Sequence, residues 1–110
     1  MFVRNRPLRN EFAKRCLKLV DNGVALNFKD KIYQLYFDGV FDEDASQENV
    51  FRAACAPVLD DVLRGNNASL FVYGQTGTGK TYTMGTLEAI KSEDQGLIPL
   101  SLNYLINHLR

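Results

Sequence analysis

The stretch Gly74-Gln75-Thr76-Gly77-Thr78-Gly79-Lys80-Thr81 decides how the rest of the chain is interpreted. It matches the pattern G-x-x-x-x-G-K-[ST] in full, and the apolar run 70–73 directly before it has the composition of a β-strand. The residues that follow Lys80 lack proline and can open a helix. Because strand, glycine-rich loop and helix stand in this order, the sequence predicts an α/β fold with a phosphate-binding loop over 74–81.

The residue types of this loop suit a polyphosphate ligand. Gly74, Gly77 and Gly79 permit positive φ and a close approach of the backbone to the ligand. Successive N–H groups in such a loop form a concave anion site, and the helix behind it adds about half a positive charge. We expect Lys80 to reach the β- and γ-phosphates and the Thr81 hydroxyl to coordinate Mg²⁺. The alternative is a glycine-rich turn before a buried helix, with no ligand.

Two other nucleotide-binding patterns do not fit. A dinucleotide fingerprint fails because Gly77-x-Gly79-x-x is followed by Tyr82 and not by glycine. A small GTPase is disfavoured because the chain contains no N-K-x-D segment for reading guanine.

Composition narrows the classes of protein to which the chain can belong. The 110 residues suit one domain or part of one, and 13 basic residues balance 13 acidic ones, so no net field favours nucleic acid or an anionic membrane. The sequence contains no run of 18 apolar residues, the length that a membrane-spanning helix needs, and its first six residues are not a secretory signal. Cys16 and Cys55 are expected to be reduced thiols in the cytosol, a disulfide being the minor alternative. His108 is expected at the surface, neither a ligand nor a base.

The first twenty residues are expected to form a strand and then a helix. The strand covers Met1–Arg6 and is ended by Pro7, which cannot donate to a ladder. Residues 8–20 show a helical spacing of apolar side chains, although charges crowd the segment. These apolar positions are Phe12, Ala13, Cys16, Leu17 and Val20.

The next segment predicts an antiparallel hairpin. Asp21-Asn22-Gly23 is a turn signal, and apolar residues then alternate over 24–28 and again over 33–37. The two runs are joined by Lys29-Asp30-Lys31, which is short enough for a hairpin connection.

A long helix is predicted over 47–64. Either Asp44 or Ser46 can provide its N-cap, and Gly65 suits the position just after its last turn. Pro57 lies in the interior, so we expect a kink or a broken hydrogen bond there. The apolar stripe consists of Val50, Phe51, Ala54, Val58, Leu59, Val62 and Leu63.

A second helical region follows the glycine-rich loop. It begins near Lys80 and is interrupted over 85–96 by a polar insert that we assign to a solvated loop. Helix resumes near Ile98, with Pro99 acceptable in its first turn. The apolar positions at helical spacing are Ile98, Leu102, Leu105, Ile106 and Leu109.

Five segments, in this order, resemble the beginning of a kinesin motor domain. Residues 3–7 are similar to the family's R-x-R-P segment, and 37–41 with 46–51 are similar to its F-D-x-V-F…S-Q-x-x-V-[FY] stretch. Residues 67–84 contain the extended form Y-G-Q-T-G-x-G-K-[ST]-[YFH]-T-M, which is much more specific than the short loop pattern. Residues 96–99 read Gly-Leu-Ile-Pro, as in the family. The resemblance covers essentially the whole chain.

The resemblance implies an ATP site. Arg4, Arg6 and Pro7 would line the adenine pocket, with Pro7 on one face of the base and Tyr82 on the other. The full set of implied nucleotide-binding residues is Arg4, Arg6, Pro7, Gly74, Gln75, Thr76, Gly77, Thr78, Gly79, Lys80, Thr81 and Tyr82. Asn5 departs from the apolar residue that is common between the two arginines. The insert 87–95 corresponds to a variable loop of the family, to which we assign no chemistry.

The parts needed for hydrolysis are absent from the sequence. A second carboxylate must organise the metal, and other groups must position the attacking water. Kinesins supply them through N-x-x-S-S-R and D-x-x-G-x-E segments, and neither occurs here. Asp38 follows an apolar run, but its hairpin context argues against the role of the metal-organising acid. Glu88, Glu93 and Asp94 lie in the polar insert and end no hydrophobic strand.

We therefore expect residues 1–110 to be the N-terminal part of a kinesin-like motor domain, with the three-layer αβα fold of P-loop NTPases left incomplete. The run 70–73 would then lack strand partners. The resemblance implies ATP and Mg²⁺ as cofactors, microtubules as the partner through segments beyond this chain, and a cytoplasmic, cytoskeletal location. By itself the chain is expected to bind nucleotide weakly and not to turn it over. The alternative from another class is a truncated, non-catalytic nucleotide-binding protein without motor activity.

Overall fold

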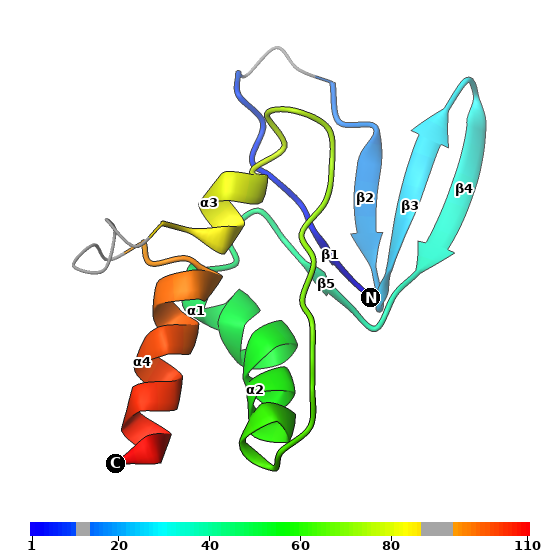
Figure 1. The fold of residues 1–110 in the computed structure, drawn as a ribbon. Helices are drawn as coiled ribbons and strands as arrows, with labels where there is room; N and C mark the ends of the chain where they lie inside the picture. The colour runs from blue at the N-terminus through cyan, green and yellow to red at the C-terminus, as the bar shows by residue number, and fades with distance from the viewer. Residues whose placement is uncertain (11–13, 87–93) are drawn as a thin grey trace. The chain divides into compact units, whose positions relative to one another are not determined.

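The computed structural model describes residues 1–10, 14–86 and 94–110. The chain divides into two compact units, Met1–Asp44 and Ala45–Arg110. The first unit contains all the strands, and the second contains all the helices of the described residues (Figure 1). Each unit is described by itself below.

A three-stranded antiparallel sheet dominates the first unit. Its strands are β2 (Leu17–Val20), β3 (Gly23–Phe28) and β4 (Lys31–Tyr36), in the spatial order β2-β3-β4. Lys29 and Asp30 form the two-residue turn between β3 and β4, with φ of 49° and 59°. Positive φ at both positions is the geometry of a type I′ turn, whose twist matches that of the flanking strands. The predicted hairpin is confirmed.

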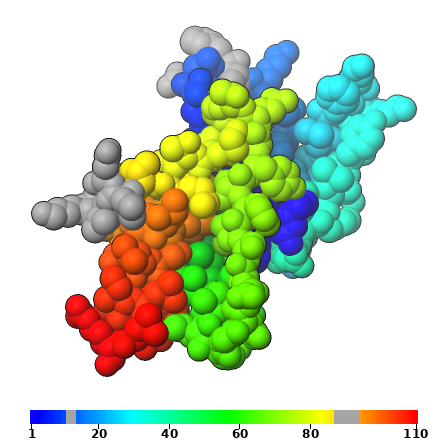
Figure 2. Space-filling model, viewed as in Figure 1, coloured from blue at the N-terminus to red at the C-terminus, as the bar shows by residue number. Residues whose placement is uncertain are grey.

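The edge strand β4 is open to solvent. All six of its residues are exposed, and in the space-filling view the cyan hairpin presents its side chains on the visible face (Figure 2). The core of the sheet lies instead near the start of β3, where Val24 is 3% exposed.

The predicted helix over 8–20 is wrong where the structure describes it. Leu17 to Val20 form β2, while Phe12 and Ala13 lie outside the described residues. Leu17 and Leu19 lie opposite Leu26 and Val24 of β3. The alternation of leucines two residues apart meets the period of a strand, and pairing with β3 outweighs the weak helical spacing. The turn that follows is confirmed, with Asn22 at φ 52°.

A short parallel pair completes the first unit. Strand β1 (Phe2–Arg4) lies beside β5 (Gly39–Phe41), and the rings of Phe2 and Phe41 stack with centroids 5.7 Å apart. The predicted strand over 1–6 is thus confirmed in a shorter form. The pairing with β5 was not predicted, because three residues are too few to show a period.

The second unit begins with a helix that changes its winding before a proline. It consists of α1 (Gln47–Val50), the π-helical segment η1 (Phe51–Cys55) and α2 (Ala56–Leu63). Ser46 is the N-cap, and its hydroxyl accepts a hydrogen bond from the N–H three residues on, at 3.1 Å. Pro57 has no N–H and cannot close an ordinary helical bond, so the break predicted there takes the form of η1, which ends two residues before it.

The helix ends in a Schellman motif. Gly65 adopts φ 92°, and its N–H donates to the carbonyl of Val62 at 2.9 Å. The N–H of Asn66 donates to the carbonyl of Asp61 at 3.0 Å. These two bonds satisfy the last carbonyls of α2, which confirms Gly65 as the stop signal.

Two further helices follow, α3 (Lys80–Met84) and α4 (Leu97–Leu109). The predicted interruption between them is confirmed for the residues described, and Pro99 lies in the first turn of α4 as expected. Most of the insert, residues 87–93 with Glu88 and Glu93, lies outside the described residues. The core between α1, η1 and α4 consists of Val50, Phe51, Cys55, Leu97 and Pro99.

The prediction of a strand over 70–73 is wrong. None of the ladders within residues 1–10, 14–86 and 94–110 includes it. Phe71 and Tyr73 are 84% and 77% exposed, so their side chains are not packed against a layer of the fold. A strand is defined by its hydrogen-bonded neighbour, which the composition of this run cannot supply.

Candidate nucleotide-binding site

The glycine-rich loop owes its shape to backbone conformations that favour glycine. Gly77 and Gly79 have φ of 80° and 99°, both in the left-handed region. Gly79 is also the N-cap of α3, so the loop turns directly into the first turn of the helix. A side chain at either position would strain the backbone, and the prediction that these glycines allow positive φ is confirmed.

Gly74 is required for a different reason, which is space. A Cβ atom on this residue would lie 2.6 Å from the hydroxyl oxygen of Thr78. That hydroxyl donates to the carbonyl of Gln75 at 2.7 Å, and the N–H of Thr78 donates to the same carbonyl at 3.2 Å. The loop therefore closes on itself through Thr78, and the missing side chain of Gly74 makes room for the closure.

The ammonium group of Lys80 contacts the backbone of the loop. Its ammonium donates to the carbonyl oxygens of Gly74 at 2.5 Å and of Gln75 at 2.9 Å. Lys80 is the first residue of α3 and half-buried, so a short helix presents it and the loop backbone orients it. A phosphate entering the loop would meet a cation already in place, beside the positive end of a helix.

Thr81 and Tyr82 follow on the same helix and are both exposed, Tyr82 by 52%. The Thr81 hydroxyl is a hard oxygen ligand accessible to a metal at the loop. In the part of the chain that the structure describes, no group of three or more His, Cys, Asp and Glu residues could hold a metal ion. The exposed Thr81 hydroxyl fits a hard cation such as Mg²⁺, which takes oxygen ligands.

The other residues implied for the nucleotide lie in the first unit. Arg4 is the last residue of β1 and half-buried, and Arg6 and Pro7 follow it at exposed positions. The structure thus assembles Gly74 to Tyr82 within one continuous loop and helix start, while Arg4, Arg6 and Pro7 belong to β1 and the segment directly after it.

One buried polar residue near the loop was not assigned a role from the sequence. Gln47 is 4% exposed, and its side-chain amide donates to the backbone carbonyl of Tyr82 at 2.5 Å. It links the start of the long helix to the helix that carries Lys80 and Thr81. The signal in the sequence was its place in the S-Q-x-x-V-[FY] stretch, because a polar residue directly after an N-cap is otherwise expected to be exposed.

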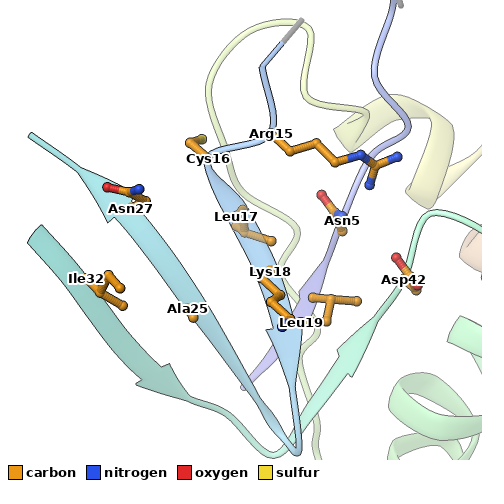
Figure 3. A pocket seen from close by; sticks show the side chains of 10 residues that line it. All are labelled: Asn5, Arg15, Cys16, Leu17, Lys18, Leu19, Ala25, Asn27, Ile32 and Asp42. Atoms are coloured by element: carbon orange, nitrogen blue, oxygen red, sulfur yellow. The ribbon is translucent and has the colours of Figure 1, made fainter. Parts of the chain in front are cut away.

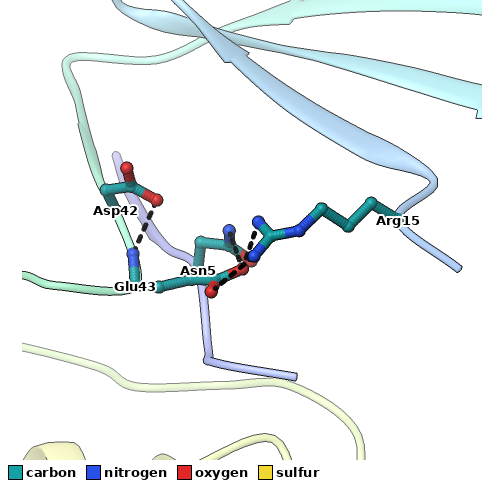
Figure 4. Close-up of polar contacts among 4 residues, drawn as sticks. All are labelled: Asn5, Arg15, Asp42 and Glu43. Atoms are coloured by element: carbon teal, nitrogen blue, oxygen red, sulfur yellow. Dashed lines mark hydrogen bonds and ion pairs between the residues drawn. The ribbon is translucent and has the colours of Figure 1, made fainter. Parts of the chain in front are cut away.

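Asn5 contacts a polar cluster in the first unit. Glu43 forms a two-pronged ion pair with Arg15, at 2.8 and 3.2 Å, and the amide of Asn5 lies 3.5 Å from the same carboxylate (Figure 4). Glu43 also donates its N–H to the carboxylate of Asp42 at 2.7 Å. The polar side chain at position 5, where the family commonly has an apolar one, therefore faces a partly buried carboxylate.

This cluster borders an open hollow of about 560 Å³ (Figure 3). Leucine, alanine and isoleucine side chains of the sheet form its apolar part. The lining residues are Asn5, Arg15, Cys16, Leu17, Lys18, Leu19, Ala25, Asn27, Ile32 and Asp42. None of the residues implied for the nucleotide lines it, so the hollow is no part of the candidate site.

The remaining ionisable candidates have structural surroundings. The carboxylate of Asp38 pairs with the N-terminal ammonium of Met1, whose hydrogen bond and charge hold the pKa of Asp38 below its ordinary value. Cys16 and Cys55 are both free thiols, as predicted. Burial raises the pKa of the Cys55 thiol. His108 is exposed, as predicted, and its Nδ1 lies 2.8 Å from the carbonyl oxygen of Tyr104.

No helix in the described ranges is both long and apolar enough to cross a membrane.

Comparisons with known proteins bear on the whole chain. The family model for the kinesin motor domain matches residues 9–110. Kinesin-related protein 13 of Dictyostelium discoideum is 48% identical over 86 residues, which cover 78% of this chain and 7% of that protein. Kinesin heavy chain of Drosophila melanogaster is 39% identical over 112 residues, which cover 96% of this chain and 11% of that protein.

The fold agrees with these matches. A solved structure of a fast kinesin, reported for its ATPase mechanism and its interactions with microtubules, superimposes with a TM-score of 0.87 at 28% identity. The match covers 96% of this chain and 31% of that one. The expected α/β, kinesin-like fold class is confirmed. The chain spans a small part of these relatives, whose family comprises nucleotide-binding motors that move along microtubules. The chain belongs to the kinesin motor domain family.

Proposed function

We propose that this chain forms the N-terminal, ATP-binding part of a microtubule-based motor domain. Its loop Gly74–Thr81 would hold the phosphates of Mg-ATP, with Thr81 on the metal and Tyr82 against the base. Arg4, Arg6 and Pro7 enter the proposal through the family resemblance, as residues that contact the adenine. Hydrolysis and movement on microtubules belong to a motor domain that also has the switch and microtubule-binding segments.

The observation that carries the proposal is the position of Lys80. Its ammonium is held by two carbonyl oxygens of the loop, at 2.5 and 2.9 Å, at the point where the loop turns into α3. A cation in this place can meet β- and γ-phosphate oxygens without a large movement. Hydrogen bonds to charged groups contribute about 1.5–3 kcal/mol each, so removal of the ammonium should weaken nucleotide binding roughly 10- to 100-fold.

The test is equilibrium binding of a fluorescent ATP analogue to the wild-type chain and to Lys80→Ala, with and without Mg²⁺. We expect measurable wild-type affinity, a 10- to 100-fold loss in the variant by the estimate above, and a dependence on Mg²⁺ that Thr81→Val removes. Lys18→Ala, which removes an exposed lysine of β2, is the matched control and should bind like wild type. Equal binding by Lys80→Ala and wild type would reject the proposed site.

Two further measurements define the function. ATP should displace the probe better than GTP, and a preference for GTP would contradict the adenine assignment. A steady-state ATPase assay of this chain, with and without microtubules, should show no turnover, because the switch segments are absent from its sequence. Microtubule-stimulated turnover that is lost in Lys80→Ala would show that the chain hydrolyses ATP by itself.

A further inference from the structure

We propose that Gln47 is a positioning residue of the nucleotide site, which holds the phosphate-binding helix α3 in place from the start of the long helix. This inference rests on the proposed function, since it concerns the same loop and helix. It assigns a role to a residue that contacts no part of the expected ligand and acts through the backbone.

The first step of the argument is the weakness of α3. The helix has only five residues, Lys80–Met84, fewer than an isolated helix needs to persist in water. It also ends abruptly, because Gly85 adopts φ 75° and leaves the helical path. Contacts from elsewhere must therefore keep the helix in its orientation.

The second step is where Gln47 makes its contact. The Tyr82 carbonyl lies in the last turn of α3, where carbonyls commonly take partners from outside the helix. The Gln47 amide donates to it at 2.5 Å, and Gln47 is 96% removed from solvent, with a relative exposure of 4%. The bond itself is partly buried, so it is shielded from competing water more than a surface hydrogen bond would be.

The third step connects this contact to the ligand. Tyr82 follows Lys80 and Thr81 directly, so a displacement of its carbonyl moves the two residues that would meet phosphate and metal. Thr83, the next residue, is buried, and its N–H donates to the carbonyl of Gly79 at 2.9 Å. The bond from Gln47 thus acts on the turn of helix that joins the loop.

A fourth observation shows that the end of α3 is held closely on its other side. A Cβ on Gly85 would lie 2.7 Å from the Cα of Gly96, so the backbones before and after the insert touch at these two glycines. Gln47 and this glycine contact together fix the last turn of α3. Of these two contacts, only the one from Gln47 can be changed from a donor to an acceptor by a substitution of similar size.

The experiment uses two variants of nearly equal size. Gln47→Met cannot donate, and Gln47→Glu can donate only when its carboxyl is protonated. Affinity for the fluorescent ATP analogue is measured from pH 5.5 to 8, always as the ratio to wild type at the same pH, so titration of the ligand and of other protein groups cancels. Glu48→Gln, at an exposed position of the same turn, is the control.

We expect Gln47→Met to bind roughly tenfold more weakly than wild type at every pH. Gln47→Glu should be at least as weak at pH 8, where a carboxylate would face a carbonyl oxygen. It should recover towards wild type as the pH falls, because burial raises the pKa of a carboxyl group and its protonated form donates. A loss of packing alone would give no such recovery. Wild-type affinity in Gln47→Met, or a pH-independent ratio in Gln47→Glu, would overturn the inference.

Two further outcomes remain decisive. If wild type binds no nucleotide, the proposed function fails, and exchange of the Thr83 amide with solvent tests Gln47 separately. Faster exchange in Gln47→Met than in Glu48→Gln supports its hold on α3, and equal exchange rejects it. If the Gln47 variants lose their helical circular dichroism, the wild-type chain is used. Nucleotide should then slow exchange of the Gln47 side-chain amide together with Thr83, and an unchanged Gln47 amide would overturn the inference.

Discussion

The hairpin Gly23–Tyr36 and the run 70–73 are both rich in apolar and aromatic residues, yet only the hairpin is a sheet element. The hairpin supplies its own partner strand through a two-residue turn, so its ladder closes within 14 residues of sequence. The run 70–73 has no neighbouring strand within the described ranges, and Phe71 remains 84% exposed. Apolar composition therefore predicts that a segment can be a strand, while the presence of a partner decides whether it is one.

The hairpin and the region of the glycine-rich loop also differ in the contacts that stabilise them. The hairpin depends on local geometry at Lys29 and Asp30. Helix α3, which follows the glycine-rich loop, is contacted at its end by residues far away in sequence, namely Gln47, 35 positions before Tyr82, and the glycine at position 96. If this comparison holds, damage to a distant contact of α3 should cost more than damage to a local turn.

The largest effect is expected at Gly96. In Gly96→Ala the new Cβ would lie 2.6 Å from the carbonyl carbon of Met84 and closer still to backbone atoms of Gly85, and backbone atoms cannot rotate away. We expect a loss of about 2–3 kcal/mol in the free energy of unfolding, measured by urea denaturation. Gly65→Ala is the matched control, because its Cβ would meet open space and only the left-handed φ of 92° opposes it. The control should lose about 1 kcal/mol. Equal losses in the two variants would break the comparison.

A smaller effect of opposite sign is expected at the hairpin turn. Lys29 and Asp30 both adopt positive φ, which costs ordinary residues free energy and costs glycine little. The double change Lys29→Asn and Asp30→Gly should therefore stabilise the first unit by about 1 kcal/mol, since Asn-Gly suits a type I′ turn. The check is thermal unfolding followed by the circular dichroism of the strands. A destabilised protein would show that the hairpin depends on more than its turn.

The smallest expected effect concerns the two thiols and leaves stability unchanged. Cys16 is exposed in the first unit, whereas Cys55 is buried among helices and its pKa is raised by burial. Since the thiolate is the reactive form, Cys55 should have less of it at neutral pH. Alkylation mapped by mass spectrometry should modify Cys16 first and Cys55 only slowly, with the rate at Cys55 rising as the pH increases. Equal rates at pH 7 would mean that the helical unit opens readily.

Several local features could be read from the sequence in advance. The turn at 21–23, the hairpin, the N-cap (narrowed to Asp44 or Ser46), the stop at Gly65 and the start of α3 at Lys80 each depend on residue types within a few positions. The shape of the glycine-rich loop also depends on nearby residues. Its glycines set the backbone conformation, and Thr78 bonds to a carbonyl within the loop.

The prediction failed for residues 17–20 and for the partner of β1, where short segments carried too little periodicity. Leu17 and Leu19 fit a strand only when β3 lies beside them. Proline at position 57 predicted a break in the helix, but the π-helical form of the break required the whole structure.

By itself the sequence determined the residue pattern of the glycine-rich loop, the hairpin and the resemblance to a motor family, because each depends on contiguous residues with fixed spacing. The tertiary structure alone decided that the apolar run before the loop pairs with no strand of the described residues, that the buried Gln47 bonds to Tyr82, and that Gly85 and Gly96 lie in contact. The physical reason is that a hydrogen bond or a contact between distant segments depends on where both partners come to lie, which no local pattern specifies.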